Sequence, residues 1–318
     1  MKIGVDAMGG DYAPLHVVLG AIQAVEHLSP GSEIVLFGNE RKIKEICHSQ
    51  YFDPCRFDIV SSSQVIEMGE HPVRAFQQKH DSSIVSGFMA LQRGEIDSFA
   101  SAGSSGAMLM GAQSILKTIK GISRSCISTE YPIQTGGTAL LLDVGLNADC
   151  RPDNLLEFGI LGSTYAQNIM GVKQPRVALL NIGEEPEKGS LLTREAYKMM
   201  DGTPYFHFVG NIEATQLFTG TVADVIVTDG FSGNIVIKQA EAMFQLLKDF
   251  QFGNAYFDRF DYEVYGGAPV LGINAPVMIG HGASSPRAIA HMILKCEVAY
   301  KGGLVQKIKE AISNKWAY

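Results

Sequence analysis

Residues 2–11, KIGVDAMGGD, decide how this chain of 318 residues folds. The stretch begins with the apolar and β-branched residues typical of a buried strand, and it reaches two glycines that permit a tight turn. Residues Pro14–Leu28 follow with apolar side chains at helical spacing. A strand that passes through a small turn into a helix is the repeating unit of parallel α/β sheets, so this stretch predicts an α/β fold.

The same unit recurs along the chain. Short apolar runs predict strands at Lys2–Ala7, Glu33–Phe37, Ser98–Ser101, Ala139–Val144, Val177–Ile182, Tyr205–Val209, Ala223–Thr228 and Val277–Gly280. Helical spacing predicts helices at Pro14–Leu28, Glu40–Cys47, Ile84–Leu91 and Pro152–Met170, and others that end near Leu116 and Phe250, begin at Pro286, or follow Gly302 and Gly303. The glycine- and proline-dense stretch Tyr265–Pro276 is expected to be a loop. We expect residues 1–318 to form a single intertwined α/β catalytic unit, as one domain or two intimate subdomains, around a largely parallel sheet with helices on both faces.

The composition narrows the class of protein. With 46% hydrophobic and 19% charged residues, the chain is globular rather than disordered. Its formal net charge of −7 argues against broad nucleic-acid binding, which needs a basic surface. The five cysteines are scattered without zinc-ligand spacing, the N-terminus lacks the pattern of a signal peptide, and every apolar run is far shorter than the roughly 20 residues that span a bilayer. We therefore expect a cytoplasmic protein with reduced thiols.

Four predicted strand-to-helix turns combine glycine with small polar residues, at Asp6–Asp11, Ser101–Gly106, Asn181–Glu185 and Asp229–Asn234. In α/β sheets such turns gather at the carboxyl ends of the strands, where N–H groups at helix N-termini attract anions. The alternative is that any α/β protein needs tight turns at these points. Because four such turns converge in this topology, the sequence favours a phosphate-type site.

Three common motifs are absent. The glycines of residues 103–111 lack the GxGxxG spacing of a dinucleotide-binding fold. Lys188 precedes Gly189, whereas a P-loop needs the reverse order. Residues 230–233 are one residue short of the GxSxG nucleophile elbow. NAD-binding, NTPase and esterase functions are therefore disfavoured.

Several polar residues near these turns are candidates for chemistry. Lys188, beside two glutamates, is either the point charge that binds phosphate or a member of a solvated ion-pair cluster. His281 follows a strand, where an imidazole either donates to a developing oxyanion or is satisfied by backbone. Asp143 and Asn147 lie at a strand end and have the simpler alternative of capping the helix that begins at Pro152.

Taken in order over nearly the whole chain, these turns resemble the motifs of the phosphate acyltransferases of bacterial phospholipid synthesis (the PlsX family). The matching stretches are Val5–Asp11, Ser101–Ala107, Asp143–Asn147, Leu180–Glu185 with Lys188–Gly189, Gly210–Glu213, Thr228–Asn234, Tyr265–Ala268 and His281–Gly282. Ser104, Leu146 and Ala214 depart from the residues usual in that family. The family also carries a long helical hairpin after the helix that ends near Phe250, whereas this chain has only Gln251–Val264 there.

The resemblance implies a three-layer α/β/α fold with a large mixed, mostly parallel sheet, like that of isocitrate and isopropylmalate dehydrogenases, in a homodimer. It implies transfer of a long-chain fatty acyl group from acyl-acyl-carrier protein to inorganic phosphate, which gives acyl phosphate for phospholipid synthesis without a metal or organic cofactor. The membrane glycerol-3-phosphate acyltransferase that uses this product is an expected contact. The alternatives are a phosphotransacylase that acts on acyl-CoA, a decarboxylating dehydrogenase of the same fold, and a non-catalytic scaffold for lipid enzymes.

In this interpretation phosphate is already an anionic nucleophile, so no activated serine or cysteine is needed. Phosphate binding is predicted for the Ser101–Gly106 loop and Lys188. Oxyanion stabilisation or proton transfer is predicted for His281, and orientation of the reacting groups for Asn181, Asn211 and Asn234. Substrate binding is predicted for Gly9, Gly10, Asp11, Ser101, Gly103, Ser104, Ser105, Gly106, Asn147, Glu184, Glu185, Glu213, Asp229 and Gly230.

Docking of an acidic carrier protein requires a local basic patch on this acidic chain. The candidates are Lys301, Lys307, Lys309 and Lys315 near the C-terminus, and Arg41, Lys42 and Lys44. The alternative is that they lie on ordinary solvated helix faces. Residues 250–260 retain an aromatic edge, but the aspartates around them make attraction to anionic lipid poor, so any membrane contact is expected to be weak.

Overall fold

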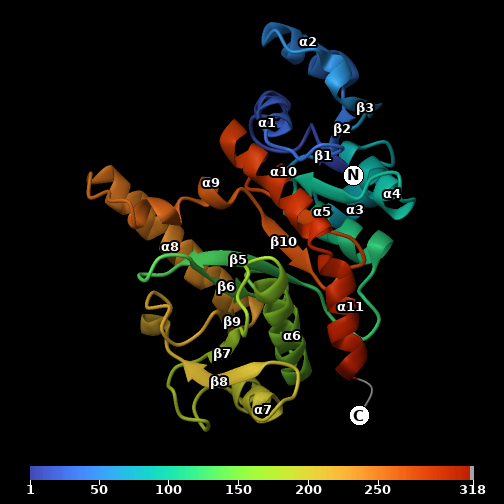
Figure 1. The fold of residues 1–318 in the computed structure, drawn as a ribbon. Coiled ribbons are helices and arrows are strands. Elements are labelled where there is room, and N and C mark those ends of the chain that lie inside the picture. The colour runs from blue at the N-terminus through green and yellow to red at the C-terminus, as the bar shows by residue number, and fades with distance from the viewer. Residues whose placement is uncertain (316–318) are drawn as a thin grey trace. The chain divides into compact units, whose positions relative to one another are not determined.

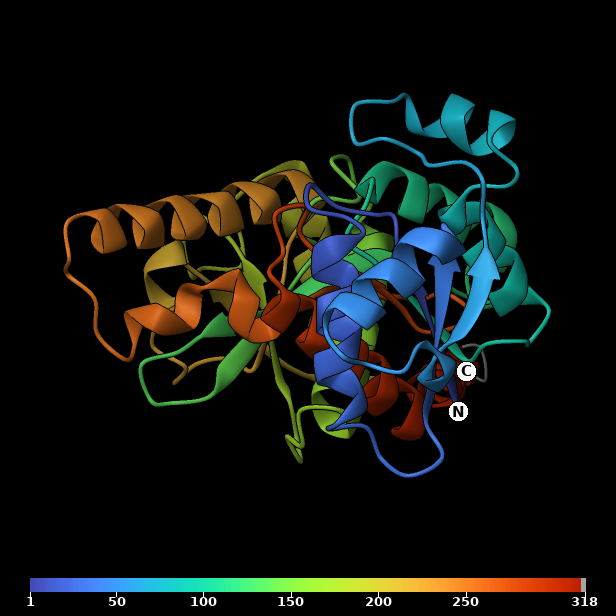
Figure 2. The ribbon, with the colours of Figure 1, turned by 90° about the horizontal axis from the view of Figure 1, so that it is seen from above.

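The computed structural model describes residues 1–315 and divides the chain into two compact units. Unit 1 comprises residues 1–118 and 262–301, and unit 2 comprises residues 119–261 and the segment from residue 302 onward. The chain therefore passes from one unit to the other at residues 118–119, 261–262 and 301–302. Each unit is discontinuous in sequence, and each has its own strands and its own covering helices (Figures 1 and 2).

Unit 1 is built on strands that the sequence largely predicts. Its strands are β1 (Lys2–Asp6), β2 (Glu33–Gly38), β3 (Asp58–Ser61), β4 (Ser98–Ser101), β10 (Ala268–Leu271) and β11 (Val277–Ile279). Its helices are α1 (Leu15–Val25), α2 (Glu40–Ser49), α3 (Pro72–Gln78), α4 (Ser83–Gln92), α5 (Ser105–Gly111), α9 (Tyr262–Tyr265) and α10 (Pro286–Lys301), with one 3-10 turn at Pro54–Arg56 and one π turn at Ala112–Leu116.

The strands of unit 1 lie in the order β3-β2-β1-β4-β11-β10, and they are parallel except for the antiparallel pair β10–β11. Helices α1 and α10 pack together against the sheet, while α4 covers its other face (Figure 1). The interior is aromatic: Phe99 meets Phe37 and Phe88 edge-on, with ring centroids 5.9 and 5.2 Å apart. Such a covered sheet explains the continuous apolar runs of its strands.

The stretch predicted to be a loop, Tyr265–Pro276, contains β10, so that expectation was wrong. Its glycines flank the strand instead of interrupting it: Gly266 and Gly272 lie at φ 73° and 86°, where glycine carries no steric penalty. Between them Val270 and Leu271 are buried, and Val270 pairs with Val277 of β11. Burial on a neighbouring strand outweighs the local turn propensity here.

Unit 2 has strands β5 (Cys126–Pro132), β6 (Thr138–Leu142), β7 (Arg176–Leu180), β8 (His207–Ile212) and β9 (Val225–Val227). Its helices are α6 (Pro152–Asn168), α7 (Leu191–Met200), α8 (Gly230–Asp249) and α11 (Leu304–Lys315), with 3-10 turns at Ala214–Gln216 and Phe257–Phe260. The strand order is β5-β6-β9-β7-β8, and only β5 runs antiparallel to its neighbour. Both units therefore have mixed sheets in which parallel pairs predominate.

The two faces of the unit 2 sheet are covered by different helices (Figure 1). On one face α6 lies close enough that a Cβ on Gly162 would stand 2.6 Å from Val225, and α11 packs beside α6. On the other face Leu141 and Ile226 form a cluster against which Val236 and Ile237 of α8 pack. Neighbouring residues of each strand thus point to opposite faces, as the period of a strand requires.

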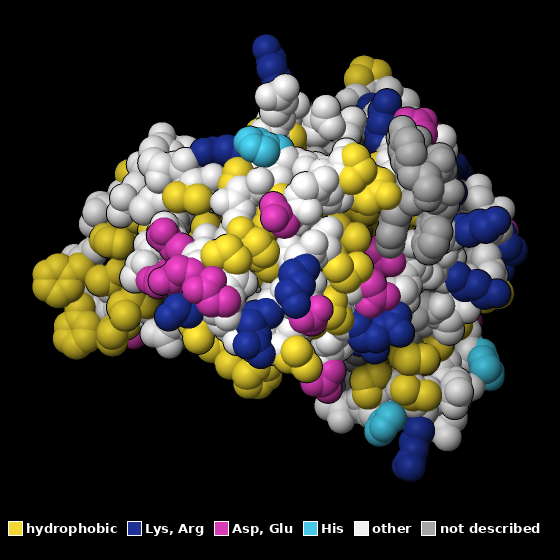
Figure 3. Space-filling view, turned by 90° about the horizontal axis from the view of Figure 1, so that it is seen from below, with side chains coloured by type: hydrophobic (Ala, Val, Ile, Leu, Met, Phe, Trp, Pro, Cys, Tyr) yellow, Lys and Arg dark blue, Asp and Glu magenta, His cyan; other side chains and the backbone are white. Residues whose placement is uncertain are grey.

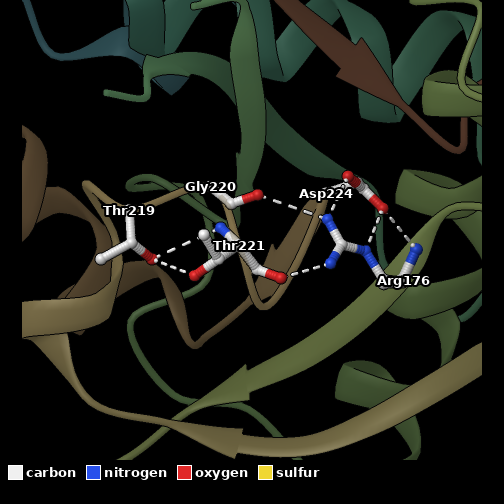
Figure 4. Close-up of polar contacts among 5 residues, drawn as sticks. All are labelled: Arg176, Thr219, Gly220, Thr221 and Asp224. Carbon is white, nitrogen blue, oxygen red and sulfur yellow. Dashed lines mark hydrogen bonds and ion pairs between the residues drawn. The ribbon is translucent and has the colours of Figure 1, made fainter. Parts of the chain in front are cut away.

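Arg176, the first residue of β7, is hydrogen-bonded to Asp224, the residue that precedes β9 (Figure 4). Its Nε and Nη2 donate to the two oxygens of Asp224, each at 2.9 Å, and its guanidinium also donates to the carbonyls of Thr221 and Gly220. Burial alone would raise the pKa of Asp224, but the hydrogen bonds and charge of Arg176 outweigh it, and the pKa is lowered. This fork geometry is specific to arginine.

Helix α8 is long but barely covered, since only Gly230 and Gly233 are buried along it. Its exposed side chains include Phe231, Ile235 and Leu246, and Phe250 follows at its end. Hydrophobic side chains also protrude at the left edge of Figure 3, and acidic and basic side chains are interspersed on the rest of that face. No helix among residues 1–315 is long and apolar enough to cross a membrane.

Candidate active site

In unit 1 the turn after β1 and the turn after β4 are fastened together by Asp6. Its Oδ1 accepts from the backbone N–H of Met8 (3.0 Å), and its Oδ2 accepts from the hydroxyl of Ser101 (2.6 Å). That hydroxyl in turn accepts from the N–H of Gly103 (2.9 Å). A Cβ on Gly9 would lie 2.7 Å from the nitrogen of Gly103, so the two turns touch backbone to backbone. Glycine is needed at residue 9 for this close approach.

The remaining predicted residues of the second turn serve largely to build it. Ser104 is buried, and its hydroxyl accepts from the N–H of Ala107 as the N-cap of α5 (3.4 Å). A Cβ on Gly106 would lie 2.4 Å from Pro72, so this glycine makes room for α3. Ser105 is exposed. Packing therefore accounts for Ser104 and Gly106 without a ligand.

His281 lies beside the first of these turns. The N–H of Asp11 donates to the carbonyl of Gly282 (2.8 Å), and Gly10 at φ 116° faces the same carbonyl. The Nδ1 of His281 accepts from the N–H of Ala283 (3.2 Å), which places the proton of the neutral ring on Nε2. The ring packs against that of Tyr262 at a tilt of 32°, with centroids 4.6 Å apart, and the side chain is exposed. The Nε2–H is therefore oriented as a donor at the surface of the unit.

In unit 2 the turn after β6 depends on Asp143, which is fully buried. Its Oδ1 accepts from the N–H of Ile127 (3.0 Å), and its Oδ2 accepts from the backbone and side-chain nitrogens of Asn147 (2.6 and 2.8 Å). The carbonyl of Asn147 accepts from the N–H of Gly230, the first residue of α8 (2.7 Å). These contacts fix the start of α8, so the simpler reading that Asp143 and Asn147 cap the helix at Pro152 was wrong.

The side chains predicted to bind substrate near this turn are mostly engaged within the protein. Asn147 is 7% exposed and its amide also donates to the carbonyl of Ser125 (2.8 Å). Asp229 is the N-cap of α8 and accepts from the N–H of Ser232 (2.7 Å). A Cβ on Gly230 would lie 2.7 Å from the backbone of Asn147, so a packing reason accounts for this glycine. Asn234 lies against Gly145 and is exposed.

The turn after β7 presents a cation without an acidic partner. Asn181 closes the turn by donating to the carbonyl of Lys188 (3.1 Å). Gly189, at φ 91°, lies so close to the Asn181 side chain that a Cβ there would be 2.1 Å from its Oδ1. The aliphatic stem of Lys188 lies over Gly183, 3.0 Å from an ideal Cβ there. Within residues 1–315 the ammonium of Lys188 forms no ion pair or hydrogen bond, although its own turn contains three glutamates. It is therefore available to an anion.

Asn211 and the glutamates complete this cluster at the carboxyl ends of β7 and β8. The amide of Asn211 donates to the carbonyl of Glu185 (2.9 Å), and its buried Oδ1 has no hydrogen-bond partner among the described residues. Glu184 accepts from Gln216 (2.8 Å), whose own oxygen accepts from the N–H of Glu213 (2.8 Å). The glutamates thus organise the turn instead of neutralising Lys188.

The structure therefore gathers the predicted residues into three clusters. In unit 1 it brings together Gly9, Gly10, Asp11, Ser101, Gly103 and the His281 turn. In unit 2 it forms one cluster with Asn147, Gly230 and Asn234, and another with Asn181, Glu184, Glu185, Lys188, Asn211 and Glu213. The site prediction omitted the two buried carboxylates that hold the turns, Asp6 and Asp143. Their position as the last strand residue or the first residue after a strand was the signal.

Thiol chemistry is disfavoured in these clusters. Cys150 lies beside the Asn147 turn, and burial raises the pKa of its thiol to about 12. Cys126 is fully buried, and burial raises the pKa of its thiol as well. Neither is a thiolate nucleophile at neutral pH. Among the described residues no group of three or more His, Cys, Asp or Glu side chains is placed to hold a metal ion.

The basic residues proposed to dock a carrier protein mostly have acidic partners on their own helices. Lys44 pairs with Glu40 at 2.6 Å and Arg41 with Glu45 at 3.1 Å on α2. The C-terminal candidates Lys301 and Lys307 pair with Glu297 and Glu310, Lys309 is partly exposed, and the side chain of Lys315 lies outside the described part. These pairs favour solvated helix faces over a docking patch.

Comparison with known proteins assigns the chain to a family. A family model described as "Fatty acid synthesis protein" matches residues 1–252. A phosphate acyltransferase of Dictyoglomus turgidum is 39% identical over 333 residues, which cover 98% of this chain and 98% of the relative. The chain belongs to the phosphate acyltransferase family. The resemblance drawn from the turn motifs is confirmed.

Solved structures are similar in fold at low sequence identity. A phosphotransacetylase from Streptococcus pyogenes has a TM-score of 0.65 at 19% identity and covers 98% of this chain and 94% of its own. A 4-hydroxythreonine-4-phosphate dehydrogenase from Klebsiella pneumoniae has a TM-score of 0.57 at 12% identity and covers 94% of this chain and 97% of its own. Both agree with the predicted α/β class.

Proposed function

We propose that this chain transfers a long-chain fatty acyl group from the thioester of an acyl-acyl-carrier protein to inorganic phosphate, which yields acyl phosphate for phospholipid synthesis. Family membership supports acyl transfer to phosphate. The observation that carries the proposal on structural grounds is Lys188, an exposed cation that its three neighbouring glutamates leave unpaired. An unpaired ammonium in a glycine-containing turn is suited to an anionic substrate.

The reaction needs little from the protein beyond binding and charge stabilisation. An oxygen of phosphate attacks the thioester carbon, and the tetrahedral intermediate collapses with cleavage of the C–S bond. The proton of hydrogen phosphate passes to the departing thiolate, so the products are acyl phosphate and the free thiol of the carrier. Holding phosphate near the carbonyl and stabilising the oxyanion are therefore the expected catalytic contributions.

His281 is proposed to stabilise the oxyanion as a neutral hydrogen-bond donor. Because its Nδ1 accepts from the N–H of Ala283, the donating proton lies on Nε2. The contact with the Tyr262 ring restrains the plane of the imidazole. A donor that is oriented before the charge develops stabilises it without reorganisation.

Family membership also supports four further proposals, which concern the fold, the oligomeric state, the location and the fate of the product. We propose the isocitrate dehydrogenase-like arrangement of the fold, a homodimer, a cytoplasmic location with weak membrane contact, and delivery of the product to a membrane acyltransferase that uses acyl phosphate. The exposed apolar side chains of α8, such as Phe231, Ile235 and Leu246, support an interface of some kind on unit 2.

The proposal is tested by incubating the protein with phosphate and a long-chain acyl-acyl-carrier protein and trapping the product with hydroxylamine. The expected result is acyl hydroxamate that depends on protein and on phosphate, with acyl-CoA a poorer donor. The Lys188→Ala variant should need a higher phosphate concentration, while Lys173→Ala, at an exposed residue outside the predicted sites, serves as the matched control. Absence of hydroxamate, or a preference for acyl-CoA, would refute the proposed donor.

A further inference from the structure

The carboxylate of Asp6 occupies an unusual position for an ionisable group. It is 1% exposed, so no substrate touches it, yet no lysine or arginine pairs with it within the described residues. Burial raises the pKa of the Asp6 carboxyl, and hydrogen bonds from Ser101, Ser83 and the backbone N–H groups of Met8 and Gly9 act in the opposite direction. A buried carboxyl held only by neutral donors costs free energy, so an explanation is needed for its presence.

The hydrogen bonds of Asp6 divide between two turns. Oδ1 accepts from its own turn at Met8, and Oδ2 accepts from Ser101, which ends the adjacent parallel strand β4. Since the proton of the Ser101 hydroxyl points at Asp6, a lone pair of the same oxygen is left to accept from the N–H of Gly103. One carboxylate therefore fixes the backbone of both turns.

The two turns pack so closely that little space remains around the carboxylate of Asp6. A Cβ on Gly9 would lie 2.3 Å from the Oδ2 of Asp6, and a Cβ on Gly103 would lie 3.0 Å from the Cα of Gly9. No room is left for a side chain at Gly9, and a side chain at Gly103 would press on the backbone of Gly9. An asparagine has one acceptor and one donor, whereas the two donors of Met8 and Ser101 require two acceptors.

We propose that Asp6 is a positioning residue of the phosphate acyltransfer reaction, which holds the turns Asp6–Asp11 and Ser101–Gly106 in one fixed arrangement for binding phosphate. This inference rests on the proposed function and on the phosphate-type site that the sequence predicts at these turns. Asp6 acts through Ser101 and the backbone, and it does not contact the reacting atoms.

The chain offers a matched control at the opposite ends of the same two strands. Asp97 precedes β4, and its Oδ2 accepts from the N–H of Lys2 at the start of β1 (2.7 Å). Asp97→Asn therefore perturbs the same strand pair with the same change of atoms, away from the turns. Asp6→Asn should raise the KM for phosphate about tenfold or more with a smaller change in kcat, because a hydrogen bond to a buried charged group is lost. Asp97→Asn should leave the KM for phosphate unchanged.

A double-mutant cycle tests whether the effect passes through Ser101. The variants are Asp6→Asn, Ser101→Ala and the pair together, with the KM for phosphate as the readout. If the two residues act through their shared hydrogen bond, the double variant should raise the KM for phosphate no more than the more damaging single variant does. If the fold-change in KM of the double variant equals the product of the two single fold-changes, Asp6 and Ser101 act separately, which would overturn the proposal. Should Asp6→Asn fail to fold, Ser101→Ala, which removes only the hydroxyl's contacts with Asp6 and Gly103, is compared with Asp97→Asn instead.

Backbone amide exchange gives a readout that does not depend on turnover. Asp6→Asn should accelerate exchange in residues 101–106 as well as in residues 7–11, while Asp97→Asn should accelerate neither. Binding of inorganic phosphate alone, followed by phosphorus NMR, should weaken by a similar factor in Asp6→Asn. If exchange rises only within residues 7–11, or if phosphate binding is unchanged, Asp6 is not a positioning residue. If the wild-type protein binds phosphate but makes no acyl phosphate, the proposed function fails while the exchange and binding results still decide the role of Asp6.

Discussion

Replacing Gly9 by alanine tests whether the two turns of unit 1 must touch. The added Cβ would lie 2.3 Å from the Oδ2 of Asp6 and 2.7 Å from the nitrogen of Gly103. Neither atom yields easily, because Asp6 is buried and Gly103 is held by its hydrogen bond to Ser101. Gly9 is not among the residues with positive φ, so the cost is steric alone.

Forcing an extra methyl into a packed site costs about 1–3 kcal/mol. In a chain of this size each kcal/mol lowers Tm by about 2–4 °C, so the expected fall in Tm is about 2–12 °C. Because the turns must separate to admit the methyl, the KM for phosphate should also rise about tenfold, the factor that corresponds to 1.4 kcal/mol of lost binding. Differential scanning calorimetry and phosphate-dependent hydroxamate formation measure the two effects.

Gly69→Ala is the matched control, since no atom lies within 4 Å of its ideal Cβ and its φ is not positive. It should change the free energy of unfolding by less than about 0.5 kcal/mol and leave phosphate kinetics unaltered. The reasoning is refuted if the two alanine variants have the same Tm and the same KM for phosphate.

Three further predictions concern unit 2 and His281. Arg176→Met should lower the free energy of unfolding by about 2 kcal/mol in urea titrations, because it leaves Asp224 without its charged donors, whereas a loss below about 0.5 kcal/mol would count against the fork. Since the pKa of Asp224 is lowered on folding, this contribution is present above its unfolded pKa and disappears as pH falls through its folded pKa; Arg176→Met should therefore match wild type only in acid. Lys188→Ala should raise the KM for phosphate about tenfold at unchanged Tm, with the exposed Lys173→Ala as control. His281→Ala should lower kcat about a hundredfold with little change in KM, and an equal loss of binding would show a different role.

The sequence predicts the positions of the strand-to-helix turns better than it predicts the bounds of every strand and helix. Ser98–Ser101 is a strand with the predicted bounds, because four small or apolar residues end in a glycine turn. Strand β5 was missed since its Ser, Thr and Glu residues conceal a segment that pairs antiparallel with β6. Strand β8 begins two residues later than the predicted Tyr205–Val209 and ends three later, because its pairing with β7 sets its register. A helix was expected after the Asn181–Glu185 turn, but its bounds were not predicted; a run of charged residues separates that turn from the N-cap of α7, Ser190.

The candidate site could be predicted only to the level of turns. Glycines and polar residues after the strands predict where the turns lie, and in the structure the turns lie at those positions. Which side chains remain free cannot be read from residue type alone: Asn147, Ser104 and Asp229 are engaged in building turns and helix ends, whereas Lys188 is unpaired. Hydrogen-bond partners that lie far apart in sequence decide this difference.

Direct transfer to phosphate is tested most decisively by the fate of the phosphate oxygens. Phosphate labelled at every oxygen is incubated with the protein and a long-chain acyl-acyl-carrier protein, and the acyl phosphate is weighed by mass spectrometry. Attack of phosphate on the thioester carbon predicts a product that retains every labelled oxygen, formed in step with free carrier thiol. A product that has lost one label, or release of the carrier thiol that does not require phosphate, would contradict the proposed reaction.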